Sequence, residues 1–81
     1  MTPSEIAELM QEIVDLDEVG VDAGFFEVGG NSFLALTLLA RIHERTGIML
    51  SLLDVVRAPT AVEVSGLLAR QAAEVGAAGG E

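Results

Sequence analysis

The sequence predicts an all-α fold: a small four-helix bundle of three longer helices and one short helix, with a long loop between the first two. Capping signals precede apolar residues at helical spacing, and no segment alternates apolar and polar residues as a half-buried strand does. Hydrophobic residues make up 51% of the 81 residues, but aromatic residues only 4%. A core this aliphatic is typical of a small helical bundle.

The first predicted helix begins after Thr2. Pro3 occupies the first helical position and Glu5 lies three residues after the cap, which is the pattern of a capping box. Apolar residues then recur at positions i, i+3, i+4, i+7 and i+8: Ile6, Leu9, Met10, Ile13 and Val14. This spacing predicts an amphipathic helix of about three turns with one buried face.

Between Asp15 and Asn31 the helical periodicity fails, and four glycines interrupt the chain. A segment of this length without its own periodicity predicts a long loop of the kind that is often functional. We expect Phe25, Phe26 and Val28 to pin this loop to the core. The glycine pair at its end predicts a sharp turn that leads into a helix, because glycine adopts backbone angles that other residues avoid.

A second helix is predicted from Asn31 or Ser32 to about Thr46, where Gly47 ends it. The first amide groups of a helix have no partner within it, and the helix dipole is positive there. A phosphate on the hydroxyl oxygen of Ser32 would therefore be favoured electrostatically.

Two apolar stripes run along this second helix. The core stripe consists of Ala35, Leu38, Leu39 and Ile42. A surplus stripe on another face consists of Phe33, Leu36 and Ala40. Two interpretations stay open: the surplus stripe is a docking surface for other proteins, or the helix is simply more buried than average.

The remaining helices follow from two further capping patterns. Ser51 and Asp54 predict a helix of one or two turns, which Pro59 closes. Thr60 and Glu63 predict the start of a last helix that runs to about Val75. We accordingly expect one domain over residues 1–75 and a flexible tail over residues 76–81, which is rich in glycine and alanine.

Charge and composition exclude several classes of function. The formal net charge is −9, and eight of the thirteen acidic residues precede Arg41, the first basic residue. Such a field repels nucleic acid and anionic lipid and attracts partners that carry arginine and lysine. Cysteine is absent, and no signal peptide or apolar run long enough to span a membrane is present. These features predict a cytoplasmic protein, and we expect a monomer.

No catalytic residue and no metal site are predicted. Ser32 as a nucleophile would need a general base, and the only histidine, His43, lies three turns along the same helix. The segment that begins at Asp15 resembles a calcium loop only at its start. Its fifth position is Val19 and its twelfth is Phe26, where a bidentate glutamate is required.

The run from Asp22 to Leu34 resembles the signature of acyl and peptidyl carrier proteins, the thiolation domains of nonribosomal peptide and polyketide synthesis. In that family an aspartate, a Phe-Phe pair and a Gly-Gly-x-Ser core lead into the second helix. The segment Ala58-Pro59-Thr60 is similar to the family's start of the last helix, so the resemblance spans nearly the whole chain. This chain departs from the usual pattern at Val28, Asn31 and Phe33.

The resemblance implies that Ser32 carries 4′-phosphopantetheine, installed covalently from coenzyme A by a separate phosphopantetheinyl transferase. Gly30 and Asn31 would form the flanking turn, and Phe33, Leu36 and Ala40 would face partner enzymes. Those partners would be an adenylating enzyme and downstream condensation, tailoring or transferase enzymes of a natural-product pathway.

The glycine pair and the second helix, which has one acid against two arginines, favour an aminoacyl or peptidyl cargo. Two alternatives stay open. One is a polyketide or fatty-acyl carrier. The other is an unmodified helical interaction module in which Ser32 is only a helix cap.

Overall fold

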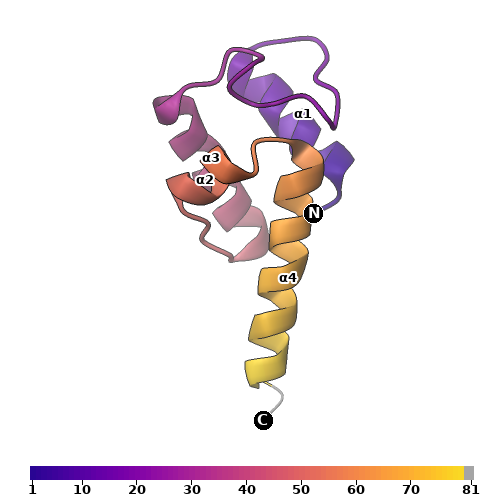
Figure 1. The fold of residues 1–81 in the computed structure, drawn as a ribbon, viewed down its shortest axis with the longest axis vertical. Coiled ribbons are helices and arrows are strands. Elements are labelled where there is room, and N and C mark those ends of the chain that lie inside the picture. The colour runs from indigo at the N-terminus through magenta and orange to yellow at the C-terminus, as the bar shows by residue number, and fades with distance from the viewer. Residues whose placement is uncertain (80–81) are drawn as a thin grey trace.

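The computed structural model describes the backbone of residues 1–79 and the side chains of residues 1–73. Four helices make up the fold: α1 (Pro3–Val14), α2 (Ser32–Thr46), α3 (Leu52–Arg57) and α4 (Ala61–Gly79) (Figure 1). No strand occurs within residues 1–79. The predicted all-α fold, with three longer helices, one short helix and a long loop after the first, is confirmed.

The predicted helix starts are confirmed by their hydrogen bonds. The Thr2 hydroxyl accepts from the Glu5 N–H at 3.2 Å, and the Glu5 carboxylate accepts from the Thr2 N–H at 2.9 Å. This hydrogen bond from the Thr2 backbone, reinforced by the Thr2 hydroxyl, holds the pKa of Glu5 below its usual value. Ser51 and Asp54 form the same reciprocal pair at α3.

The core gathers apolar side chains from every helix and from the long loop. It includes the whole predicted core stripe of α2. Its buried members are Ile6, Ala7, Leu9, Met10, Val19, Phe25, Ala35, Leu38, Leu39, Ile42, Leu50, Val55, Ala61, Val64 and Leu68. Phe25 is completely buried, while Phe26 and Val28 are half-buried against this core. The prediction that these three residues pin the loop is confirmed.

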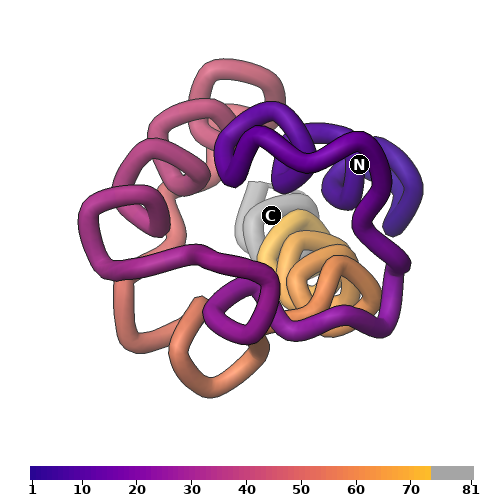
Figure 2. The backbone as a smooth tube through the Cα atoms, turned by 90° about the horizontal axis from the view of Figure 1, so that it is seen from above, coloured from indigo at the N-terminus to yellow at the C-terminus, as the bar shows by residue number. Residues whose placement is uncertain are grey.

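The loop between α1 and α2 is also held by backbone hydrogen bonds to the start of α4. The N–H of Phe25 donates to the Pro59 carbonyl at 2.9 Å, and the N–H of Val62 donates to the Val21 carbonyl at 3.1 Å. Seen from above, the loop passes over the end of the bundle close to the first turn of α4 (Figure 2). The middle of the long loop, at Val21 and Phe25, is thus tied to the beginning of α4.

The last helix is longer than predicted. It continues to Gly79 and extends beyond the other helices (Figure 1), so residues 76–79 of the expected tail are helical. Alanine is the best helix former, and a single glycine costs only about 1 kcal/mol in a helix, so Gly76 does not end it. Residues 80 and 81 of the expected tail lie outside the described residues. Within the described range, no helix has the length and hydropathy needed to cross a membrane.

Candidate functional site

The two glycines before Ser32 form the predicted sharp turn, and each is required for a different reason. Gly29 has a φ of +113°, a region that side-chain-bearing residues rarely adopt. Gly30 packs directly on Phe25. A Cβ atom at Gly30 would lie 2.5 Å from two ring carbons of Phe25 and 2.6 Å from its carbonyl oxygen. The N–H of Gly30 donates to that same carbonyl at 2.9 Å, which fixes the turn against the buried ring.

Asn31, and not Ser32, caps helix α2. The Asn31 side-chain oxygen accepts from the Leu34 N–H at 2.9 Å, and its backbone is extended. Ser32 is the first residue of the helix, and its side chain is exposed. Within residues 1–73, no hydrogen bond involves the Ser32 hydroxyl. The hypothesis that Ser32 serves only as a cap is therefore wrong.

The surroundings of the Ser32 hydroxyl suit a phosphate group. Asn31 satisfies only the N–H of Leu34, and no acceptor in the described part of the chain takes the N–H of Ser32 or Phe33. The first turn of α2 also contains no acidic residue. Two amide donors and the positive end of the helix dipole are thus available to an anion attached at Ser32.

The surplus stripe of α2 points into solvent. Phe33 is 76% exposed, Leu36 is 54% exposed, and Ala40 is also exposed. The alternative interpretation, that α2 is buried nearly all round, is therefore wrong. Phe33 is the most exposed large apolar residue among the described residues, and it directly follows Ser32, so an apolar face of α2 lies open to solvent beside the attachment candidate.

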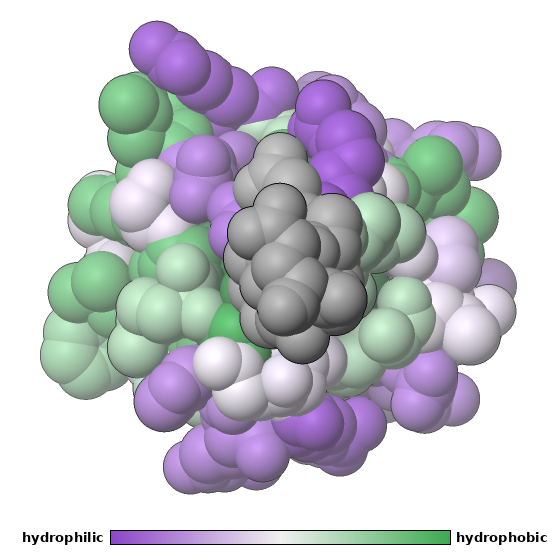
Figure 3. All heavy atoms as spheres, turned by 90° about the horizontal axis from the view of Figure 1, so that it is seen from below, coloured by the Kyte–Doolittle hydropathy of each residue, from purple (hydrophilic) through white to green (hydrophobic). Residues whose placement is uncertain are grey.

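Sequence reasoning missed further exposed apolar residues on the neighbouring helix. Leu53 and Val56 of α3 are 54% and 53% exposed, although Val55 between them is buried. Helix α3 packs against α2. The spacing of Leu53 and Val56 at i and i+3 could have indicated a second apolar face on this short helix. In the view of the molecule from below, apolar and hydrophilic residues lie side by side on the surface (Figure 3).

The hydroxyl of Ser32 makes no hydrogen bond to a histidine or carboxylate side chain of residues 1–73. His43 lies near the other end of α2 with its side chain exposed. Among the described residues, no group of three or more histidine, aspartate or glutamate side chains is placed to hold a metal ion. The chemistry available at this site is that of a presented hydroxyl beside an anion-favouring helix end.

Comparisons with known proteins match both the sequence and the fold. The phosphopantetheine attachment site family matches residues 4–68. The chain is 42% identical over 71 residues to the dimodular nonribosomal peptide synthase of Bacillus subtilis (strain 168). This alignment covers 85% of this chain but only 3% of the length of that protein.

Two solved structures show the same fold. A peptidyl carrier protein in complex with the phosphopantetheine transferase Sfp and coenzyme A aligns with a TM-score of 0.82 and 23% identity, over 86% of this chain and 91% of that one. The A-PCP structure of McyG with phenylalanyl-adenylate aligns with a TM-score of 0.77 and 27% identity, over 83% of this chain and 10% of that one.

Proposed function

The chain belongs to the phosphopantetheine attachment site family, and from this premise we propose that Ser32 is the residue that carries 4′-phosphopantetheine. The observation that carries the proposal is the exposed hydroxyl at the first position of α2, which makes no hydrogen bond within the described residues and adjoins two available N–H groups. When bound, the group supplies a thiol on a long flexible arm that holds an acyl cargo as a thioester.

Modification of Ser32 requires an attacking oxygen, a leaving group and an acceptor for the hydroxyl proton. In the transfer from coenzyme A, the Ser32 oxygen forms a bond to the phosphorus of the pantetheine phosphate, and the bond from that phosphorus to the adenosine bisphosphate portion breaks. The hydroxyl proton needs an acceptor, and His43, the single histidine of the sequence, lies at the far end of α2. In this proposal the transferase supplies the base, and the carrier supplies a fixed, accessible hydroxyl.

We also propose that Phe33, Leu36 and Ala40 dock partner enzymes, together with Leu53 and Val56 of α3. All five are exposed. A small apolar surface suits contacts that form and release repeatedly, because weak transient interfaces bury little area. The adenylating partner is supported by the McyG A-PCP structure, in which a carrier and an adenylating domain occur together.

The proposed cargo is an aminoacyl or peptidyl group of a nonribosomal peptide pathway, which the similarity to a nonribosomal peptide synthase supports. In this proposal the chain itself catalyses nothing, and downstream condensation, tailoring or transferase enzymes act on the tethered acyl group. Tethering raises the effective concentration of the cargo at each docked active site. The carrier would act as a monomer in the cytoplasm, where coenzyme A is available.

The modification is tested by mass spectrometry of the intact chain after incubation with a promiscuous phosphopantetheinyl transferase and coenzyme A. Wild type should gain the mass of one phosphopantetheine group, and Ser32→Ala should gain none while keeping its helical circular dichroism. Ser4→Ala is the matched control, because Ser4 is also an exposed serine in the first turn of a helix. Modification of Ser32→Ala, or an unmodified wild type, would refute the assignment.

Docking is tested separately by the rate at which an adenylating enzyme loads the modified carrier. Phe33→Asp should still accept phosphopantetheine at Ser32 but should load more slowly. Val62→Asp is the matched control, because Val62 is also exposed, at 44%, but lies on α4. Equal loading of Phe33→Asp and wild type would count against the docking surface. Charging by a fatty-acyl or polyketide-type enzyme alone would instead identify the other class of carrier.

A further inference from the structure

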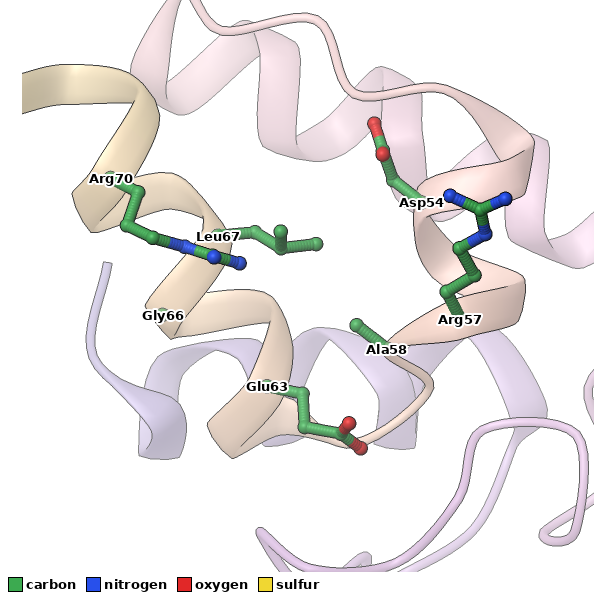
Figure 4. A pocket seen from close by; sticks show the side chains of 7 residues that line it. All are labelled: Asp54, Arg57, Ala58, Glu63, Gly66, Leu67 and Arg70. Atoms are coloured by element: carbon green, nitrogen blue, oxygen red, sulfur yellow. The ribbon is translucent and has the colours of Figure 1, made fainter. Parts of the chain in front are cut away.

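Helix α2 begins without an acidic residue, in contrast to the other three helices. Helices α1, α3 and α4 each have an acid as the third helical residue: Glu5, Asp54 and Glu63. Figure 4 shows two of them, Asp54 in the first turn of α3 and Glu63 in the first turn of α4, where they line a hollow of about 690 Å³ between these helices. The third residue of α2 is Leu34. The first turn of α2 therefore lacks the negative charge that the positive end of a helix dipole favours.

The sequence around this helix start is free of acids over a long stretch. The nearest acids along the chain are Glu27 and Glu44, so residues 28–43 contain none. The cap, Asn31, is also uncharged, although aspartate is an equally good cap. An aspartate at this position would lie next to a group attached at Ser32 and would repel a negatively charged one. The neutral cap therefore suits a neighbouring anion.

The start of α2 matters for the stability of the whole domain. Helix α2 packs against both α1 and α3 and contributes four buried residues to the core. Ser32 and Phe33 themselves are exposed, so the first turn gains little from packing. It depends instead on the Asn31 cap, and the N–H groups of Ser32 and Phe33 have no acceptor among residues 1–73. A charge that stabilises this turn therefore stabilises the cooperative fold.

We propose that attachment of phosphopantetheine stabilises the fold of this chain, because the phosphodiester supplies the negative charge that the start of α2 lacks. This inference rests on the function proposed for Ser32. A phosphodiester is negatively charged at neutral pH, and attachment at the first helical residue puts this charge at the positive end of the helix dipole. The carrier is then more resistant to unfolding in the form that can hold a cargo than in the unmodified form.

The first test compares the melting temperatures of the unmodified and the fully modified chain by circular dichroism, with the modification checked by mass spectrometry. Modification should raise the melting temperature by about 1–8 °C at low salt. In about 1 M sodium chloride this gain should shrink to less than about half, because salt screens the charge. In Asn31→Asp the gain should also fall to less than about half, because the cap already carries a negative charge and repels the phosphodiester. Thr2→Asp, which puts the same charge at the cap of α1, is the matched control and should leave the gain as in wild type.

A second test needs no transferase. Ser32→Glu and Ser32→Gln introduce side chains of nearly the same size and shape, and only the first is charged. Ser32→Glu should melt about 1–8 °C above Ser32→Gln at neutral pH and low salt. This difference should disappear once the pH is low enough to protonate the glutamate. Ser4→Glu and Ser4→Gln are the matched control pair and should differ by less, because the first turn of α1 already contains Glu5.

Three outcomes would overturn the inference: a modified chain that melts like the unmodified one, an equal gain in Asn31→Asp and wild type, or a Ser32→Glu chain no more stable than Ser32→Gln. A gain that persists unchanged in about 1 M sodium chloride would also contradict it, since that result would assign the stabilisation to packing of the pantetheine arm. Failure of the proposed function looks different. Mass spectrometry would then show that wild type takes up no phosphopantetheine, or that Ser32→Ala still does.

Discussion

Replacing Gly30 by alanine would place a methyl group in space that Phe25 already occupies. The new Cβ atom would lie 2.5 Å from two carbons of the ring and 2.6 Å from the Phe25 carbonyl oxygen. The ring is completely buried, and the carbonyl accepts the Gly30 N–H. Neither neighbour can therefore move away freely, and the turn itself has to shift.

The size of the effect follows from overpacking in a rigid core. Such substitutions cost about 1–3 kcal/mol. For a domain of this size each kcal/mol lowers the melting temperature by about 4–8 °C, so we expect a fall of roughly 4–24 °C. Ser32 lies two residues further on and must move with the turn. The rate of phosphopantetheine transfer should therefore also fall, even at temperatures at which the variant is fully folded.

Substitutions at two other glycines serve as controls, because they distinguish the clash at Gly30 from the general effect of replacing a glycine by alanine. A Cβ atom at Gly20 would meet no atom within 4 Å, and Gly20 has no positive φ. Gly20→Ala should therefore raise the free energy of unfolding, by no more than about 1 kcal/mol. A Cβ atom at Gly29 would also meet nothing within 4 Å, but the residue has a φ of +113°. Gly29→Ala should therefore lower the free energy of unfolding by about 1–3 kcal/mol. Thermal unfolding followed by circular dichroism measures all three variants. A Gly30→Ala chain that melts and is modified like wild type would refute the reasoning.

Three further predictions concern the helices. Asn31→Ala removes the acceptor of the Leu34 N–H and should lower the free energy of unfolding, measured with urea, by about 1 kcal/mol. A decrease of less than a few tenths of a kcal/mol would contradict the role of Asn31 as the helix cap. Gly66→Ala replaces an exposed glycine inside α4 and should raise the free energy of unfolding by about 0.5–1 kcal/mol, whereas a loss would reveal a hidden clash. Because the pKa of Glu5 is lowered by the Thr2 bonds, its contribution is present above the ordinary value of 4.5 and is lost as the pH falls through the lowered pKa. The difference in melting temperature between wild type and Glu5→Gln should accordingly shrink on acidification, and a constant difference would contradict the linkage.

The helices and much of the core were predictable because their determinants lie three or four residues apart. The capping box of Thr2 and Glu5 and the buried stripe of α2 are both patterns within one helical turn or two. Ser32 was singled out by the same local logic, since two glycines and two capping residues precede an apolar helix.

The division of roles between Asn31 and Ser32 was not predictable, because both residue types are good caps. The choice is made by tertiary contacts: Phe25 packs on Gly30, and the Phe25 N–H binds the Pro59 carbonyl, far along the chain. Such long-range bonds leave no periodic signal in the sequence. The same holds for the hollow between α3 and α4, whose lining residues come from both helices.

At the start of α2, two residues contribute to the stability of the fold and the next two do not. Asn31 caps the helix and Gly30 fits the Phe25 ring, so both serve stability. Among residues 1–73, the hydroxyl of Ser32 makes no hydrogen bond, and the ring of Phe33, the next residue, is not buried. Substitutions at such exposed positions usually change stability by less than about 0.5 kcal/mol, so folding alone does not select a serine followed by a phenylalanine. Positions where local rules are broken without a structural gain are expected at functional sites, and for this reason we propose the attachment role for Ser32 and the docking role for Phe33.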